Sequence, residues 1–190
     1  DRHDLYRFFK LSVRRHEFRD IFKEKLDLHH IPALSNVLYS EDILFPIADF
    51  YLKKERWNEA IEVYEEMETI GALQGRGAEY YQKLGYALQK NKKYAEAIDA
   101  YLKADTLKPD NIWNNRHLAI CYRLNRNYQA ALSYYKKVEE ATPEDTNVIF
   151  HIGSCLAELG QYEEAANYFF KLDFIESNCI KAWRGIGWCS

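Results

Sequence analysis

Apolar and polar positions alternate along most of this chain with the period of an α-helix. From residue 41 onward, apolar residues recur at i, i+3, i+4 and i+7 over segments of two to three turns, which predicts a series of amphipathic helices. Short polar stretches such as 89–93 separate the segments, and Pro109 and Pro143 follow every second one. The pattern therefore predicts pairs of helices joined by short turns.

The paired pattern repeats every 34 residues. The unit that begins at residue 78 has Tyr81, Leu84, Gly85, Leu88, Tyr94, Ala97, Tyr101, Ala104 and Pro109. The next unit has, in the same order, Asn115, Leu118, Ala119, Tyr122, Tyr128, Ala131, Tyr135, Val138 and Pro143. The third has Ile149, Ile152, Gly153, Leu156, Tyr162, Ala165, Phe169, Leu172 and Ser177. We expect repeats over about 41–74, 78–111, 112–145 and 146–179, a truncated repeat over 180–190, and a separate helical segment or cap over 1–40.

Composition agrees with a helical array and excludes several other classes. The 190 residues are 47% apolar and 29% charged, and no apolar run approaches the roughly 18 residues of a membrane helix. Only 8 glycines and 4 prolines are present, far fewer than the turns of a β-sandwich or barrel require. Aromatic residues reach 15%, and their periodic placement predicts a mainly structural role between stacked helices.

These features resemble the tetratricopeptide repeat, whose 34-residue unit has an aromatic, Leu-Gly, Tyr, Ala, Phe and Pro series at matching positions. Asn115 and Ser177 depart from that series, because an aromatic residue and a proline are usual there. The resemblance implies an all-α, right-handed superhelix of antiparallel helix pairs, in which each first helix lines a concave groove and each second helix lies outside. Residues 1–40 resemble segments that precede such arrays in bacterial proteins.

The cysteines follow the repeat and do not form a metal or disulfide pattern. Cys121, Cys155 and Cys189 are spaced by 34 residues, which matches neither the short gaps between zinc ligands nor a small disulfide framework. They occupy one repeat position, where the unit from residue 78 has Ala87. We therefore interpret them as small buried residues.

No catalytic or cofactor motif is found, so the chain is not expected to be an enzyme. The glycines at 71, 75 and 77 lack the preceding strand and the following Lys-Ser/Thr of a phosphate loop, and we interpret them as an insertion between repeats. His29 and His30 lack a further metal-ligand partner. We expect no metal and no cofactor.

Two histidines, His117 and His151, share one position of successive repeats and are expected side by side in the groove. If they bind a peptide or an anion, affinity should rise as the pH falls to 6. The groove residues that the resemblance implies are Asp49, Gln82, Tyr86, Trp113, Arg116, His117, Ile120, Arg123, Asn147, Phe150, His151, Lys181, Arg184 and Trp188. The Lys, Asn, Asn, Lys, Arg set with which one branch of the family grips chaperone carboxylates is absent. Whether Trp113 faces the groove or packs on a neighbouring repeat stays open.

Charge and the chain ends limit the choice of function. Residues 1–40 carry eight basic and six acidic residues, whereas 41–190 carry 18 basic and 23 acidic ones, which argues against nucleic-acid binding. Residues 180–190 form only the first helix of a repeat, so we expect a fragment of a longer array whose end is able to self-associate. The leading hypothesis is a cytoplasmic scaffold that binds a protein or peptide in the groove, without membrane contact. The alternative is a regulatory or positioning domain of a longer enzyme.

Overall fold

The computed structural model describes residues 41–69, 76–177 and 179–189. The expectations for residues 1–40, for His29 and His30, and for the glycines at 71 and 75 lie outside this part of the chain. Within it, the chain forms nine α-helices: α3 (Glu41–Lys53), α4 (Trp57–Thr69), α5 (Gly77–Lys90), α6 (Tyr94–Leu107), α7 (Ile112–Leu124), α8 (Tyr128–Ala141), α9 (Thr146–Glu158), α10 (Tyr162–Ile175) and α11 (Ile180–Cys189). None of these helices is long and apolar enough to cross a membrane.

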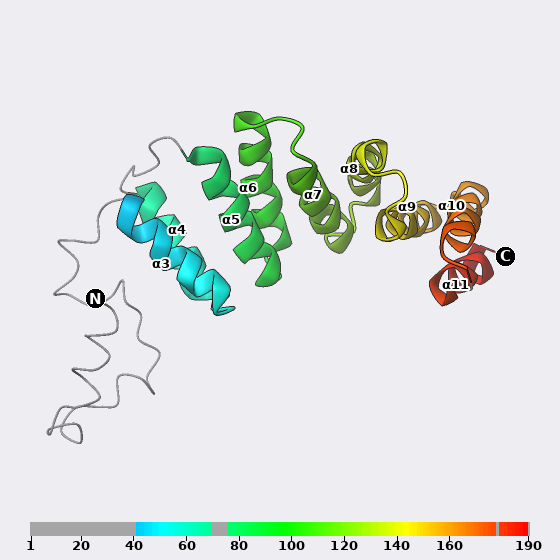
Figure 1. Ribbon diagram of the computed structural model, residues 1–190, viewed down its shortest axis with the longest axis horizontal. Helices are drawn as coiled ribbons and strands as arrows, with labels where there is room; N and C mark the ends of the chain where they lie inside the picture. The colour runs from blue at the N-terminus through cyan, green and yellow to red at the C-terminus, as the bar shows by residue number, and fades with distance from the viewer. Residues whose placement is uncertain (1–40, 70–75, 178, 190) are drawn as a thin grey trace, which may run out of the picture.

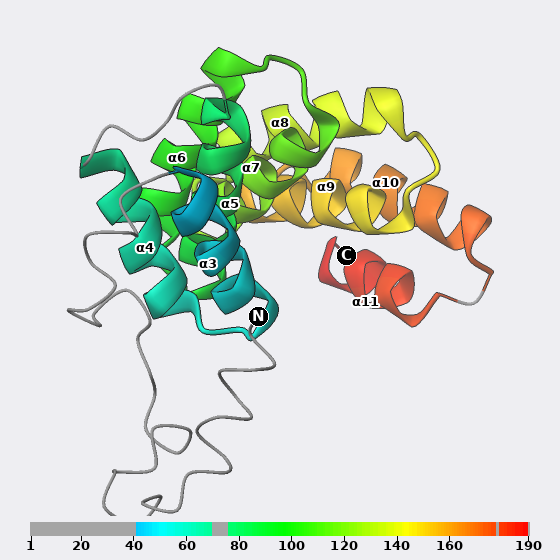
Figure 2. The same ribbon diagram turned by 60° about the vertical axis from the view of Figure 1, so that its left-hand side comes forward.

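The helices stack as successive antiparallel pairs along one axis. α3 and α4 lie at one end of the array and α10 and α11 at the other (Figure 1). A rotated view places α11 beneath α9 and α10, and α11 contacts both (Figure 2). We call α3, α5, α7, α9 and α11 the first helices and the others the second helices. The predicted all-α superhelix is confirmed.

The turn within each pair has the same backbone conformation four times. Its middle residue adopts a positive φ: 56° at Glu55, 63° at Lys92, 61° at Arg126 and 76° at Gly160. The next amide N–H then donates to a carbonyl five residues back, as from Lys93 to Leu88 over 2.9 Å. This bond closes the last turn of each first helix. Only Gly160 adopts the left-handed conformation without steric cost.

Each pair is held together by an aromatic ring packed against a small residue. The Tyr101 ring lies so close to Gly85 that a Cβ there would approach it to 2.8 Å, and Phe169 approaches Gly153 in the same way. The third pair packs Tyr135 in the corresponding place, opposite Ala119, and both are buried. Small residues on the first helix therefore set the distance between the helices of each pair.

Cys121 and Cys155 are fully buried, as predicted, and burial raises the pKa of their thiols to about 12 and about 11. Both therefore stay protonated at neutral pH. Cys189, at the same repeat position of α11, is only half-buried, because no second helix covers α11 in the described part of the chain. The described residues contain no cluster of His, Cys, Asp or Glu that could hold a metal ion.

Candidate functional site

The first helices form the inner side of the array. α5 contacts α7 directly and α9 contacts α11, whereas no two described second helices approach each other as closely. Residues of the first helices that point away from the second helices therefore share one continuous surface, which we call the first-helix face. All fourteen groove residues expected from the sequence lie on first helices.

An aromatic cluster lies at the centre of the first-helix face. The Trp113 ring lies 4.0 Å from His117 and 6.2 Å from Tyr86, and Tyr86 contacts His117 at 5.6 Å between ring centroids. Trp57 extends the cluster from α4, with its ring 6.0 Å from Tyr86. Tyr101 is fully buried beneath and stacks on His117 at 5.7 Å. Trp113 keeps 42% of its surface exposed, so it both packs on the preceding repeat and faces solvent.

His117 is held in one orientation by Gln89. The Gln89 Oε1 atom accepts a hydrogen bond from Tyr101 Oη over 3.0 Å and lies 2.8 Å from His117 Nδ1. With this oxygen as the acceptor, His117 carries its proton on Nδ1 and leaves Nε2 as an acceptor. Burial, and then the nearby Lys90 and Arg116 charges, lower the pKa of His117 to about 4.

His151 repeats the ring stacking one unit later, but its Nδ1 atom has no hydrogen-bond partner among the described residues. Its ring stacks on Tyr135 at 5.6 Å and 26°, nearly the geometry of His117 on Tyr101, and Phe150 lies beside it at 5.4 Å. Burial, followed by the Arg123 and Lys181 charges, lowers the pKa of His151 to about 4. Both imidazoles are therefore neutral at pH 6 and at pH 7. The expectation that they strengthen binding at pH 6 is wrong, because burial outweighs their ordinary tendency to protonate there.

Charged residues of the first-helix face divide into paired and unpaired groups. Arg116 forms an ion pair with Asp145 at 2.7 Å, and Asp49 forms one with Lys83 at 2.8 Å. Both pairs join neighbouring repeats, so these two predicted groove residues hold the array together.

Four cations of the face have no carboxylate partner among the described residues: Lys90, Arg123, Lys181 and Arg184. Lys90 lies 5.3 Å above the Tyr86 ring, and Lys181 lies 5.9 Å above Phe150. Arg123 Nε donates to Tyr135 Oη over 3.4 Å, a neutral partner. The centre of the face is therefore aromatic and bordered by free positive charge.

The remaining predicted residues lie around this centre. Gln82 is half-buried, and its Nε2 atom has no hydrogen-bond partner among the described residues. Ile120 packs partly into the apolar core. Asn147 is exposed, and its backbone N–H donates to the Asp145 side chain that caps α9. Trp188 is 55% exposed on α11, apart from the aromatic cluster.

Two residues of the site were not predicted. Trp57 belongs to a second helix and is not among the expected groove residues, but it reaches the cluster from the start of α4. Lys90 follows Tyr86 by four residues at the end of α5, and its ammonium group lies over the Tyr86 ring. A Lys at the end of an amphipathic segment is an ordinary solvent-facing pattern, so the sequence carried no signal for this contact.

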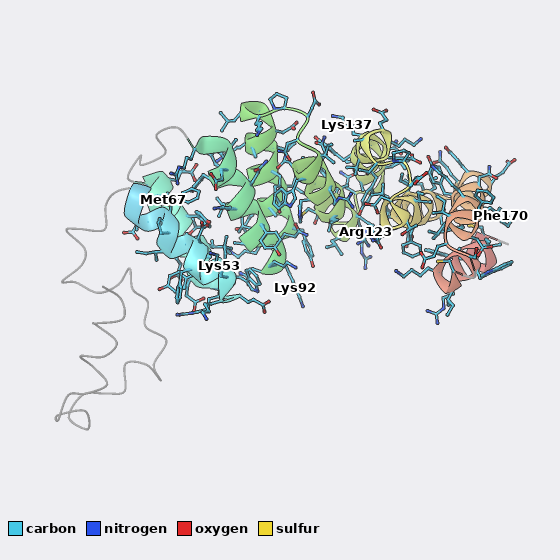
Figure 3. The ribbon with its side chains drawn as sticks, in the orientation of Figure 1. Lys53, Met67, Lys92, Arg123, Lys137 and Phe170 are labelled. Carbon is cyan, nitrogen blue, oxygen red and sulfur yellow. The ribbon has the colours of Figure 1, made fainter. Side chains whose placement is uncertain are left out.

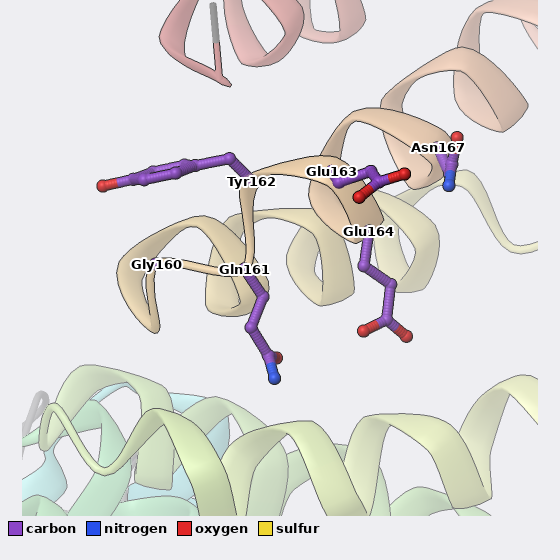
Figure 4. A pocket seen from close by; sticks show the side chains of 6 residues that line it. All are labelled: Gly160, Gln161, Tyr162, Glu163, Glu164 and Asn167. Carbon is purple, nitrogen blue, oxygen red and sulfur yellow. The ribbon is translucent and has the colours of Figure 1, made fainter.

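A separate cavity of about 510 Å³ lies at the turn between α9 and α10. It is lined by Gly160, Gln161, Tyr162, Glu163, Glu164 and Asn167. Gln161 and Glu164 point to one side and Tyr162 points away from them (Figure 4). The lining residues come from one turn and the first helical turn after it, and none of the predicted site residues is among them.

Comparison with known proteins places this architecture in one family. Sequence profiles described as tetratricopeptide repeat match residues 44–74, 78–111 and 123–186. No curated protein matches the chain.

Several solved structures have the same fold. The crystal structure of MamA protein is 24% identical, with 75% of this chain and 76% of that chain covered and a TM-score of 0.67. MamA 41-end from Desulfovibrio magneticus RS-1 is 19% identical, with 78% and 82% covered and a TM-score of 0.70. YrrB, described as a TPR protein with an unusual peptide-binding site, is 20% identical, with 83% and 79% covered and a TM-score of 0.69. With its 34-residue period, paired helices and matching profiles, the chain belongs to the tetratricopeptide repeat family.

Proposed function

We propose that the protein is an interaction scaffold that binds an extended peptide segment of a partner protein along the first-helix face. The observation that carries this proposal is Trp113, which is 42% exposed although it is packed between His117 and Tyr86. A large ring that is rigidly held but still exposed loses little conformational freedom when a ligand covers it, and such residues dominate binding energy at interfaces. The similarity in fold to YrrB, with its peptide-binding site, supports the proposal.

The chemistry of the face selects the kind of peptide. The exposed Trp113 ring and the half-buried Tyr86 ring offer an apolar surface to a hydrophobic side chain, and His117 Nε2 offers an acceptor to a peptide N–H group. Lys90, Arg123 and Lys181 lie around the rings without carboxylate partners in the described residues, so acidic side chains of the ligand would find them free. We therefore propose a peptide in which acidic residues flank an apolar or aromatic residue.

A charge-reversal variant tests this proposal. The triple variant Lys90→Glu, Arg123→Glu, Lys181→Glu should bind at least tenfold more weakly to the peptides that the wild type captures from an acidic-aromatic library. A tenfold loss corresponds to roughly 1.4 kcal/mol of binding free energy. Arg116 is left unchanged, because its ion pair with Asp145 joins two repeats.

The matched control reverses three exposed lysines away from the aromatic cluster, Lys53, Lys92 and Lys108, and so changes the net charge equally. If both variants lose the same peptides to the same extent, general charge and not this face governs binding. If neither variant loses any, the first-helix face is not the binding surface.

We also propose that the α10–α11 end self-associates. Phe174 is 89% exposed, Ile180 71% and Trp183 57%, so three large apolar side chains of α10 and α11 face solvent at this end of the array. Burying large apolar residues against a second copy removes that surface from water. Sedimentation of wild type against a Phe174→Lys, Trp183→Lys variant tests this, and equal sedimentation of both at high concentration would refute it.

A further inference from the structure

A second cavity lies at the start of α7, at the opposite end of that helix from Arg123. It has a volume of about 480 Å³ and is lined by Asp110, Ile112, Asn115, Lys137, Glu140 and Ala141. The start of α7 and the end of α8 form its walls. Lys137, on this cavity, and Arg123, on the first-helix face, lie at opposite edges of the array (Figure 3).

The neighbouring repeats carry a larger side chain at the position of Asn115. The residue equivalent to Asn115 is Tyr81 in α5, Ile149 in α9 and Trp183 in α11. In α5 the Tyr81 ring lies 5.0 Å below the Lys103 ammonium group, and its hydroxyl donates to Glu68 Oε1 over 3.1 Å. The repeat containing Asn115 therefore lacks the ring that its neighbour uses at this position.

The polar groups around Asn115 also lack the partners that their equivalents have. Lys103 pairs with Glu68 at 3.2 Å, and Lys171 pairs with Glu139 at 2.6 Å. Lys137 occupies the same repeat position but has no ion pair with a described carboxylate, and lies 5.1 Å from the Tyr134 ring.

By the same spacing, the acid opposite Lys137 is an aspartate, Asp105 of α6 in the preceding repeat, at the position that Glu68 and Glu139 hold. Its side chain is one methylene shorter, and its buried Oδ1 atom has no partner among the described residues. The shorter side chain is the physical reason that the ion pair of the other repeats is not made here.

Asn115 supplies the feature that points to a ligand. The residue is only 4% exposed, it lines the cavity, and its Oδ1 atom has no hydrogen-bond donor among the described residues. A buried amide oxygen without a donor is costly, and a ligand that brings a donor removes that cost. An acidic ligand group has no proton to donate to this oxygen, and Asp110 and Glu140 of the cavity would repel it. A cationic ligand group would be repelled by Lys137.

We propose that this cavity receives a tyrosine side chain from a partner protein. The ring would lie between Ile112 and Ala141, beneath the Lys137 ammonium group, in the relation that Tyr81 has to Lys103. The phenolic O–H would donate to Asn115 Oδ1. This inference concerns other residues than those of the first-helix face and does not depend on peptide binding there.

The direct test is an NMR titration of the full 190-residue chain with N-acetyltyrosinamide, a capped tyrosine that resembles one within a polypeptide. Amide shifts should occur at Ile112, Asn115 and Ala141. N-acetylphenylalaninamide should bind on the order of tenfold more weakly, because it leaves Asn115 Oδ1 unpaired. Equal binding of the two probes, or shifts confined to the first-helix face, would overturn the proposal.

Two variants separate the roles of space and hydrogen bonding. Asn115→Tyr should place the missing ring in the cavity, unfold at or above the wild-type temperature, and abolish the shifts. Asn115→Leu keeps a side chain of similar size but removes the acceptor, so both probes should then bind equally. If Asn115→Tyr unfolds at a temperature well below that of the wild type, the cavity cannot hold a phenol ring. If Asn115→Leu still binds the tyrosine probe more tightly than the phenylalanine probe, the proposed hydrogen bond is excluded.

Discussion

The array should become less stable when the pH falls from 7 to 5, because two half-buried imidazoles resist protonation. Folding lowers the pKa of both His117 and His151 from 6.5 to about 4. Between these values the unfolded chain binds protons that the folded chain does not, so stability is complete above pH 6.5 and falls as the pH drops toward 4. Below pH 4 both states are protonated and this contribution is lost in full.

The structure sets the size of the effect. A shift from 6.5 to about 4 corresponds to about 3 kcal/mol for each imidazole once the pH is below both values, and to about 2 kcal/mol for each between pH 7 and pH 5. Both rings are only half-buried, and water that reaches the charged form reduces this cost. We therefore expect roughly half, or about 2 kcal/mol for the pair, between pH 7 and pH 5.

Urea unfolding at a series of pH values measures this loss of stability. NMR titration of the imidazole protons then shows whether His117 and His151 titrate in the range where stability is lost. The control is the double variant His117→Asn, His151→Asn, in which neither residue titrates and the amide N–H at 117 is able to replace the Nδ1–H that faces Gln89. Its stability should change by less than half as much as that of wild type between pH 7 and pH 5. Imidazoles that titrate near 6.5, or a double variant with an unchanged pH dependence, would refute the reasoning.

Three further predictions concern the repeat joints. Arg126→Gly should raise stability by about 1 kcal/mol in thermal unfolding, because φ is 61° there, whereas Gly160→Ala should lower it by a similar amount. Gly185→Ala should cost about 1–3 kcal/mol, because its Cβ would lie 2.5 Å from the Phe169 ring; an unchanged unfolding midpoint would contradict the close contact. Asp145→Ala should cost about 1–2 kcal/mol in urea unfolding, because it removes both the cap of α9 and an ion pair between repeats; Asp145→Asn should recover only the cap.

The 34-residue period accounts for most of the fold that the sequence predicted. The spacing of apolar residues indicated helices in pairs, and the repeated small position that Gly85 and Gly153 hold is where the structure brings the two helices of a pair together. Both features arise from contacts within one helix or between helices adjacent in sequence, so a local pattern carries them. The buried Cys121 and Cys155 follow from the same period.

The candidate site was only partly predictable for a related reason. The sequence indicated which residues lie on first helices, but not which of them are free to bind. Arg116 is paired with Asp145, 29 residues away, while Arg123, on the same helix, has no carboxylate partner in the described residues. The angle between successive repeats decides such pairings, and no spacing along the chain encodes that angle.

Thus the sequence by itself determined the family, the helix pairs and the face on which each residue lies, because these depend on a period of 34 residues and on local helix geometry. The tertiary structure alone decided that Trp113 is shared between core and surface, that His117 and His151 stay neutral at pH 6, and that Asn115 borders a cavity. Each of these properties depends on how far one repeat rotates against the next, and so on what each side chain meets across the joint.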